Sequence, residues 1–237
     1  MDKQLRDQLK HDKFVEEVGH TVEYLSEHKA AVRKYGVFGG IALVAIIGIW
    51  AFLSYQRSAR QEAFSAAQSI LEATAGEPQP NAPPPQYKTE AEKQEAALKA
   101  LNEVATRHSG SREGLLALLQ AGTIYCDQGR EADCEKALQQ VANGGDSEVA
   151  SLGKLSLATF YNAQGKAAQA ETLLRQLVAS PTPMVSKEQA EIALARTITS
   201  SKRDEAKKIL EGLQSSTRSP VSRAAVAAMG ELVASQK

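Results

Sequence analysis

Aromatic side chains are scarce in this chain: Phe, Trp and Tyr together make up 5% of its 237 residues. Strands are enriched in aromatic and β-branched residues, so this scarcity, beside abundant Ala and Leu, favours packed helices over a sheet. An excess of charge is also missing, because 28 basic residues balance 28 acidic ones. That balance argues against a nucleic-acid partner. Two cysteines, Cys126 and Cys134, are too few for a disulfide scaffold.

Motifs for catalysis and metal binding are missing as well. The chain has no phosphate-binding glycine loop, no HExxH, no GxSxG and no Cys/His metal spacing. His11, His20 and His28 are spaced nine and eight residues apart, which no short metal motif uses. His108 lies in HSGS and is interpreted as a cation at a helix C-terminus. These absences predict a protein that is not an enzyme and that has no catalytic residue, metal or cofactor.

What the chain does contain is one long apolar run, KYGVFGGIALVAIIGIWAFLSYQR. Residues 35–56 carry no charge, and a helix of that length spans roughly 33 Å, close to the hydrocarbon thickness of a bilayer. Trp50 and Tyr55 lie near one end and Tyr35 at the other, where membrane interfaces favour aromatic rings. A signal peptide is disfavoured by the long leader, which contains acidic residues, and by the bulky, basic residues that follow. We expect a single transmembrane helix at 35–56.

Basic residues gather before the run. Residues 1–34 contain seven Lys or Arg, whereas residues 55–74 contain two. By the positive-inside rule, the N-terminus is predicted to be cytoplasmic and the C-terminal part to lie outside, in a periplasm if the cell has one. Residues 1–34 are expected to form a charged cytoplasmic segment, helical from about Asp12. A solvated helix is the favoured interpretation, and a docking surface for a partner is the alternative.

Two glycines in the run, Gly36 and Gly40, have the GxxxG spacing that lets membrane helices approach closely. The favoured interpretation is that glycine is simply common in such helices. The alternative is that they form a contact between two membrane helices, which would allow the chain to form a homodimer.

An internal repeat with a period of 36 follows the run. YCDQGREADCEKALQQV, YNAQGKAAQAETLLRQL and TITSSKRDEAKKILEGL align, starting at Tyr125, Tyr161 and Thr197. The positions that coincide are Gly129 and Gly165; Cys134, Ala170 and Ala206; Leu138, Leu174 and Leu210; Val141, Leu177 and Leu213. The pattern predicts helical hairpins, in which a turn glycine ends one helix and a second helix packs back on it. One hairpin cannot bury its own apolar face, so neighbouring hairpins must stack.

This pattern resembles the tetratricopeptide repeat, although the last copy lacks the Tyr and the turn Gly. The resemblance implies an all-α fold, with a tetratricopeptide-like α-hairpin solenoid over residues 57–237. Within it, GEPQPNAPPPQY at 76–87 is too rich in proline for a helix and is predicted to be a loop. Residues 220–235 are expected to form a capping helix, which solenoid ends usually need.

Leucines and threonines also recur at the 36-residue spacing on the expected first helices of the hairpins. In such solenoids the first helices line a concave face. The candidate partner-binding residues on it are Leu116, Leu119, Thr123, Leu152, Leu155 and Thr159. A groove with this lining suits apolar or helical segments of another protein. Packing of the same leucines against neighbouring helices is the alternative.

The two cysteines flank the turn at Gly129. A disulfide needs Cα atoms within roughly 7 Å, and we expect Cys134 to be offset along its helix from the residue opposite Cys126. Cys134 also occupies the small, buried position that Ala170 and Ala206 occupy in the other copies. We therefore expect two free, buried thiols. A bridge is the alternative, and it would indicate an oxidising compartment.

The layout as a whole resembles the bacterial ancillary subunit family of the Sec translocon: a charged tail, one span containing glycine, then degenerate tetratricopeptide-like hairpins. The resemblance implies an anchor in the inner (plasma) membrane and a periplasmic domain. It also implies translocon subunits, periplasmic chaperones or exported chains as partners. The predicted function is a membrane-anchored interaction scaffold in Sec-dependent export or chaperone hand-over. The alternative is an assembly factor for another envelope complex, in cell division or outer-membrane biogenesis.

Overall fold

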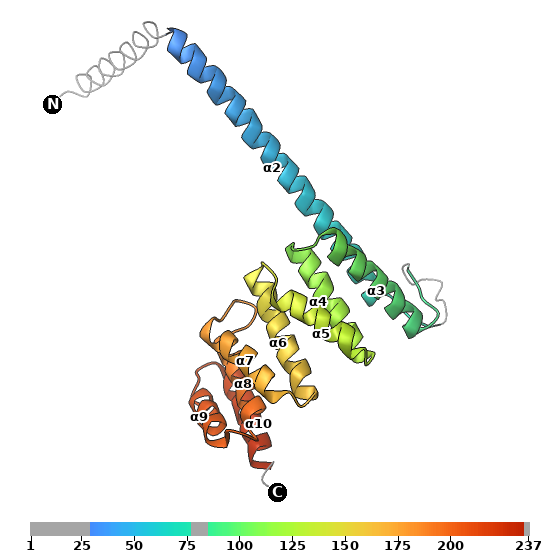
Figure 1. Ribbon diagram of the computed structural model, residues 1–237, viewed down its shortest axis with the longest axis vertical. Coiled ribbons are helices and arrows are strands. Elements are labelled where there is room, and N and C mark those ends of the chain that lie inside the picture. Colours follow the sequence, from blue (N-terminus) through green and yellow to red (C-terminus); the bar gives the residue numbers. More distant parts are fainter. Residues whose placement is uncertain (1–28, 77–84, 235–237) are drawn as a thin grey trace, which may run out of the picture. The chain divides into compact units, whose positions relative to one another are not determined.

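A computed structural model of the chain describes residues 29–76 and 85–234, and its helices confirm the all-α prediction. The helices are α2 (Lys29–Glu72), α3 (Glu90–Arg107), α4 (Arg112–Asp127), α5 (Glu131–Ala142), α6 (Ser147–Ala163), α7 (Ala167–Ala179), α8 (Lys187–Ile198), α9 (Arg203–Gln214) and α10 (Ser219–Ala234) (Figure 1). The chain divides into two compact units, Met1–Ser58 and Ala59–Lys237. Most of the helix expected from Asp12 lies outside the described residues.

The apolar run forms part of α2. The portion Arg33–Glu72 contains a window with a mean hydropathy of 2.4, of which no residue is buried. Phe38, Ile46 and Trp50 are among its exposed side chains. Among the described residues this is the one helix that is long and apolar enough to cross a membrane, and it is consistent with a single span or a signal sequence.

The last part of α2 belongs to the second unit and packs with α3. Ala67 is buried in a cluster with Leu98, Leu101 and Val104 of α3, which Ala117 of α4 joins. Beyond α2, Ala75 and Tyr87 form an isolated bridge, in which the Gly76 amide donates to the Tyr87 carbonyl at 2.9 Å. This pairing holds together the two ends of the proline-rich segment, whose residues 77–84 lie outside the described residues.

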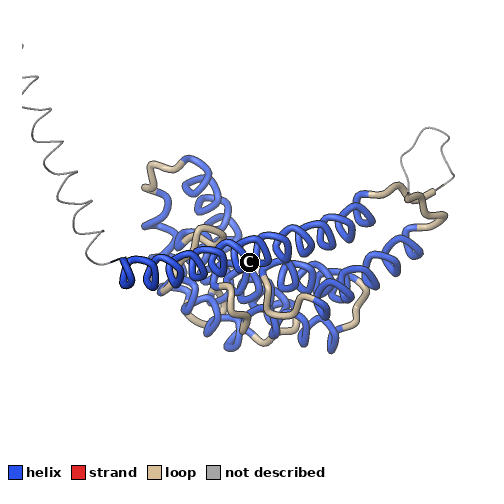
Figure 2. Tube along the Cα trace, turned by 90° about the horizontal axis from the view of Figure 1, so that it is seen from above, coloured by secondary structure: helices blue, strands red, loops and turns tan. Residues whose placement is uncertain are grey.

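The repeated segments fold as hairpins, which follow one another in chain order as α4–α5, α6–α7 and α8–α9 (Figure 1). Gly129 and Gly165 each have a φ of +71°, a backbone conformation that favours glycine. The residue after each glycine donates its amide to the carbonyl of the repeat tyrosine, Tyr125 or Tyr161, at 2.9 and 2.8 Å. The predicted turn glycines are therefore confirmed. Figure 2 shows the resulting helices joined by short loops.

The core follows the 36-residue period. Cys134, Ala170 and Ala206 are fully buried, and their small size lets each hairpin close tightly. The equivalent leucines, Leu138, Leu174 and Leu210, are each 1% exposed. The small residues predicted to allow close approach of the two helices thus lie in the core, and stacking of neighbouring hairpins completes the burial.

Two helical glycines lie at close contacts between helices. A Cβ added at Gly122 of α4 would lie 3.2 Å from Ala137 of α5. A Cβ at Gly153 of α6 would lie 2.6 Å from the backbone nitrogen of Ala142 on α5. The first contact lies inside a hairpin and the second joins one hairpin to the next. The last described helix, α10, buries Ala225, Ala228 and Leu232 in the core formed with α8 and α9.

Candidate functional site

A cavity of about 390 Å³ lies between the α4–α5 hairpin and α6. Its lining residues are Thr123, Cys126, Gly129, Glu131, Leu138, Ser156, Thr159, Phe160, Ala163 and Gln164. We call this cavity the repeat groove. Two of the six predicted partner-binding residues, Thr123 and Thr159, line it, and both are exposed. The structure thus brings together the same position of two successive repeats.

The polar groups of the repeat groove are mostly engaged within the protein. The Thr123 hydroxyl donates to the Leu119 carbonyl at 3.1 Å, and the Thr159 hydroxyl donates to the Leu155 carbonyl at 3.0 Å. Gln164 Nε2 donates to Glu131 Oε1 at 2.8 Å and so links the α6 C-terminus to α5. The groove therefore presents mainly apolar surface, with the Glu131 carboxylate as the one charged group in its lining.

The four predicted leucines do not line the repeat groove. Leu119, Leu152 and Leu155 are half-buried against the main core. Leu116 packs against a smaller cluster that includes Val141. Their partial exposure leaves part of each side chain on the surface.

The predicted membrane contact, Gly36 and Gly40, lies one turn apart on α2. A Cβ at either glycine would meet no atom within 4 Å. Pairing of two such helices through these glycines stays a prediction.

The prediction of two free thiols is wrong. Cys126 and Cys134 form a disulfide with an S–S distance of 1.91 Å and Cα atoms 5.0 Å apart. Cys134 lies in the first turn of α5, where its amide donates to the Arg130 carbonyl. This position is close to the Gly129 turn, so the offset that we expected along α5 does not separate Cys134 from Cys126. Close packing at Gly122 also draws the two helices together. Cys126 lines the repeat groove, and the disulfide is therefore part of its wall.

Sequence reasoning missed Phe160 as a groove residue. Phe160 precedes the repeat tyrosine Tyr161, and its equivalents 36 residues away are Ile124 and Arg196. Because the position varies between copies, the repeat alignment hides it. The sequence feature that could have identified it is a large aromatic side chain directly before the repeat tyrosine, in a chain with few aromatic residues.

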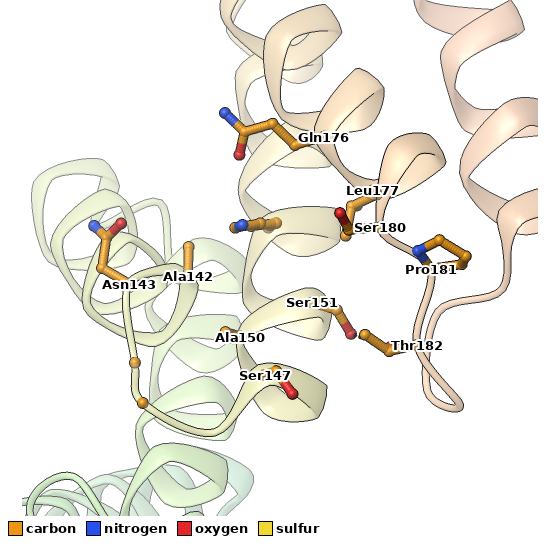
Figure 3. A pocket seen from close by; sticks show the side chains of 13 residues that line it. Ala142, Asn143, Ser147, Ala150, Ser151, Gln176, Leu177, Ser180, Pro181 and Thr182 are labelled. Atoms are coloured by element: carbon orange, nitrogen blue, oxygen red, sulfur yellow. Dashed lines mark hydrogen bonds between the residues drawn. The ribbon is translucent and has the colours of Figure 1, made fainter.

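A second cavity, of about 500 Å³, lies among the end of α5, the start of α6 and the end of α7 (Figure 3). At one edge of this cavity the hydroxyl groups of Ser151 and Thr182 share a hydrogen bond of 2.7 Å. Lys154 is the one ionisable residue in its lining. None of the predicted site residues lines this cavity. It differs from the repeat groove in the sign of its ionisable residue, which is Lys154 here and Glu131 there.

An ion-pair cluster joins successive hairpins near this end of the repeats. Arg112 at the start of α4 contacts Asp146 at 3.1 Å and Glu148 at 2.8 Å, both at the start of α6. The Val149 amide donates to the Asp146 carboxylate and, together with Arg112, holds the pKa of Asp146 below its ordinary value. The Glu148 carboxylate and Asp146 raise the pKa of Arg112. These contacts link the first helices of two successive hairpins.

Groups of three or more His, Cys, Asp or Glu side chains that could hold a metal are not found in residues 29–76 and 85–234. A family model described as "Tetratricopeptide repeat-like domain" matches residues 33–207, which is most of the chain. No curated protein and no solved structure matches the chain.

Proposed function

This chain belongs to the tetratricopeptide repeat-like domain family. From that membership and from the candidate membrane span in α2, we propose that it is a membrane-anchored scaffold holding other proteins. Domains of this family are typically non-catalytic, and they imply protein partners. The repeat groove carries the proposal, because two exposed threonines one repeat apart lie at an apolar cavity of about 390 Å³. A groove of this kind suits one or two apolar side chains of a partner segment.

The anchor is the part of α2 at residues 35–56, and the N-terminus lies in the cytoplasm. Three observations support this arrangement. The apolar run is long enough for a span, basic residues are concentrated before it, and the repeats contain a disulfide. Disulfides persist in oxidising compartments, so the bridge supports a location of the repeats outside the cytoplasm.

The process we propose is protein export, in which the repeats hold exported chains or periplasmic chaperones near the Sec translocon. The order of charged tail, single span and degenerate hairpins supports this role. Assembly of another envelope complex is the alternative that uses the same surface.

Photocrosslinking in native membranes tests the role of the groove. A photoreactive amino acid is placed at Thr159 of the full-length chain, with Thr172 as the matched control. Thr172 is also an exposed helical threonine whose hydroxyl donates to the carbonyl four residues earlier. We expect adducts with translocon subunits, chaperones or exported chains at Thr159 and not at Thr172. Adducts with cell-division or outer-membrane assembly proteins would favour the alternative process. Equal amounts of adduct at both positions would refute the proposal that the repeat groove binds the partner.

Protease added outside the inner membrane of intact spheroplasts tests the orientation. We expect digestion of the repeats and protection of the N-terminal segment. Protection of the repeats, with digestion only after detergent, would reverse the proposed orientation.

A further inference from the structure

The Glu131 carboxylate in the lining of the repeat groove has no cationic partner. Glu131 is exposed and is the first residue of α5. Among the described residues its side chain has one hydrogen bond, from Gln164 to Oε1, and no ion pair. The basic residues after the two turn glycines are engaged elsewhere, because Arg130 hydrogen-bonds Asp133 and Lys166 lies 3.6 Å from the Glu135 carboxylate.

The hydrogen bond from Gln164 does not require a charged acceptor. At the preceding junction between hairpins, Gln128 at the end of α4 donates to Gln94 Oε1 of α3 at 3.2 Å. Gln128 and Gln164 are both helix C-caps, and Gln94 and Glu131 both lie near the start of the second helix of a hairpin. A neutral amide therefore serves at one junction where a carboxylate serves at the next.

The dipole of α5 does not require Glu131 either. An acidic residue in the first turn of a helix is favourable, but α5 also has Asp133 there. The equivalent helix α7 has no acidic residue in its first turn. The packing of the hairpins thus leaves the negative charge of Glu131 without a structural role.

Apolar groups surround this carboxylate in the groove. Leu138, Phe160 and Ala163 are in the same lining, and the hydroxyls of Thr123 and Thr159 donate to their own helices. Lys and Arg side chains combine an apolar stem with a charged head, so they match an apolar cavity that has one carboxylate in its lining.

We propose that the repeat groove selects a partner segment presenting a Lys or Arg side chain flanked by apolar residues, with the basic group at Glu131. This inference rests on the proposed function, because it specifies the partner of the same groove. Charge complementarity selects this occupant. An acidic segment would bring two carboxylates together, and a purely apolar segment would remove water from the Glu131 carboxylate without giving it a partner.

Photocrosslinking of defined peptides to the full-length chain in a non-ionic detergent tests the preference. The photoreactive amino acid is placed at Thr159, and the probes are peptides with Leu-Lys-Leu, Leu-Gln-Leu or Leu-Glu-Leu at the centre, supplied at millimolar concentration. We expect the Lys peptide to give roughly threefold more adduct than the Gln peptide, and the Glu peptide to give the least. Equal adducts from the three peptides, or no adduct with the Lys peptide, would overturn the proposal.

Two substitutions of Glu131 sharpen the test. In Glu131→Gln the new amide oxygen can still accept from Gln164, as Gln94 accepts from Gln128, so the thermal midpoint should be nearly unchanged while the preference for the Lys peptide is lost. Glu131→Lys should reverse the order, so that the Glu peptide gives the most adduct. Glu95→Lys, at an exposed position on α3, is the matched control and should keep the order of the parent. A preference for the Lys peptide that persists in Glu131→Lys would refute selection by this carboxylate.

Partner adducts in native membranes separate this inference from the proposed function. With the photoreactive amino acid at Thr159, Glu131→Gln should lower the amount of partner adduct roughly threefold. An unchanged amount would count against the basic partner and leave the scaffold role in place. Absence of partner adducts from the parent chain, with the peptide preference retained, would instead count against the proposed function alone.

Discussion

Cys126 of α4 is bonded to Cys134 of α5 across the turn at Gly129, with their Cα atoms 5.0 Å apart. The equivalent positions of the next hairpin hold Asn162 and Ala170, so the crosslink is specific to the first of the aligned copies. It joins the hairpin whose two helices both line the repeat groove, and it therefore stabilises the wall of that groove.

Replacing both cysteines with alanine should lower the free energy of unfolding by about 2–3 kcal/mol, because the bridge closes a short loop in the unfolded chain. Urea unfolding of the full-length protein in detergent measures the loss. Unmodified protein with reductant serves as the control and should lose a similar amount. Detection of two free thiols in denatured protein prepared without reductant would refute the bridge.

Two glycines on helices should respond oppositely to alanine. A Cβ at Gly153 would lie 2.6 Å from the Ala142 nitrogen and 2.9 Å from the Val141 carbonyl carbon, and backbone atoms cannot move aside cheaply. Gly153→Ala should therefore destabilise the fold by about 1–3 kcal/mol. Gly212, on α9, has open space around the same position, and its replacement should stabilise by up to about 1 kcal/mol. Thermal midpoints of the two variants give the comparison; equal shifts would contradict the packing between hairpins.

Acid should weaken the contact between the α4–α5 and α6–α7 hairpins. The Val149 amide and Arg112 lower the pKa of Asp146 in the folded state. The ionised carboxylate therefore contributes stability above its unfolded pKa, near 3.9, and this contribution is lost as the pH falls through the lower folded value. Asp146→Asn keeps a good helix cap but removes the charge.

The expected result is that Asp146→Asn is less stable than the parent at pH 7 and that the difference shrinks below about pH 4. Unfolding curves at several pH values measure it. Glu95→Gln, at an exposed position on α3, is the control for loss of one carboxylate. A difference that grows on acidification would contradict the ion-pair account.

Adjacent leucines on α7 should differ in their contribution to stability. Leu174 is 1% exposed in the main core, so Leu174→Ala should cost about 2–5 kcal/mol. Leu173 is only partly buried, and its replacement should cost clearly less. Chemical unfolding of both variants tests this order, and a larger loss at Leu173 would place the core on the wrong face of the helix.

The sequence alone determined the features that depend on spacing along one helix. A charge-free run of sufficient length predicted an apolar helix, and the 36-residue period predicted the hairpins, the turns at Gly129 and Gly165, and the burial of Leu138 and its equivalents. Helical periodicity is local, so residues three and four apart share a face wherever the helix lies.

Only the tertiary structure decided which side chains from different helices meet. The axial offset between α4 and α5 brought Cys126 and Cys134 into bonding distance, against the prediction of free thiols. The position of α6 beside that hairpin placed Thr123, Thr159 and Phe160 around one cavity and left the predicted leucines between helices. Offsets of a few ångströms between packed helices depend on the summed contacts of many small residues, and no periodic pattern within a single helix specifies them.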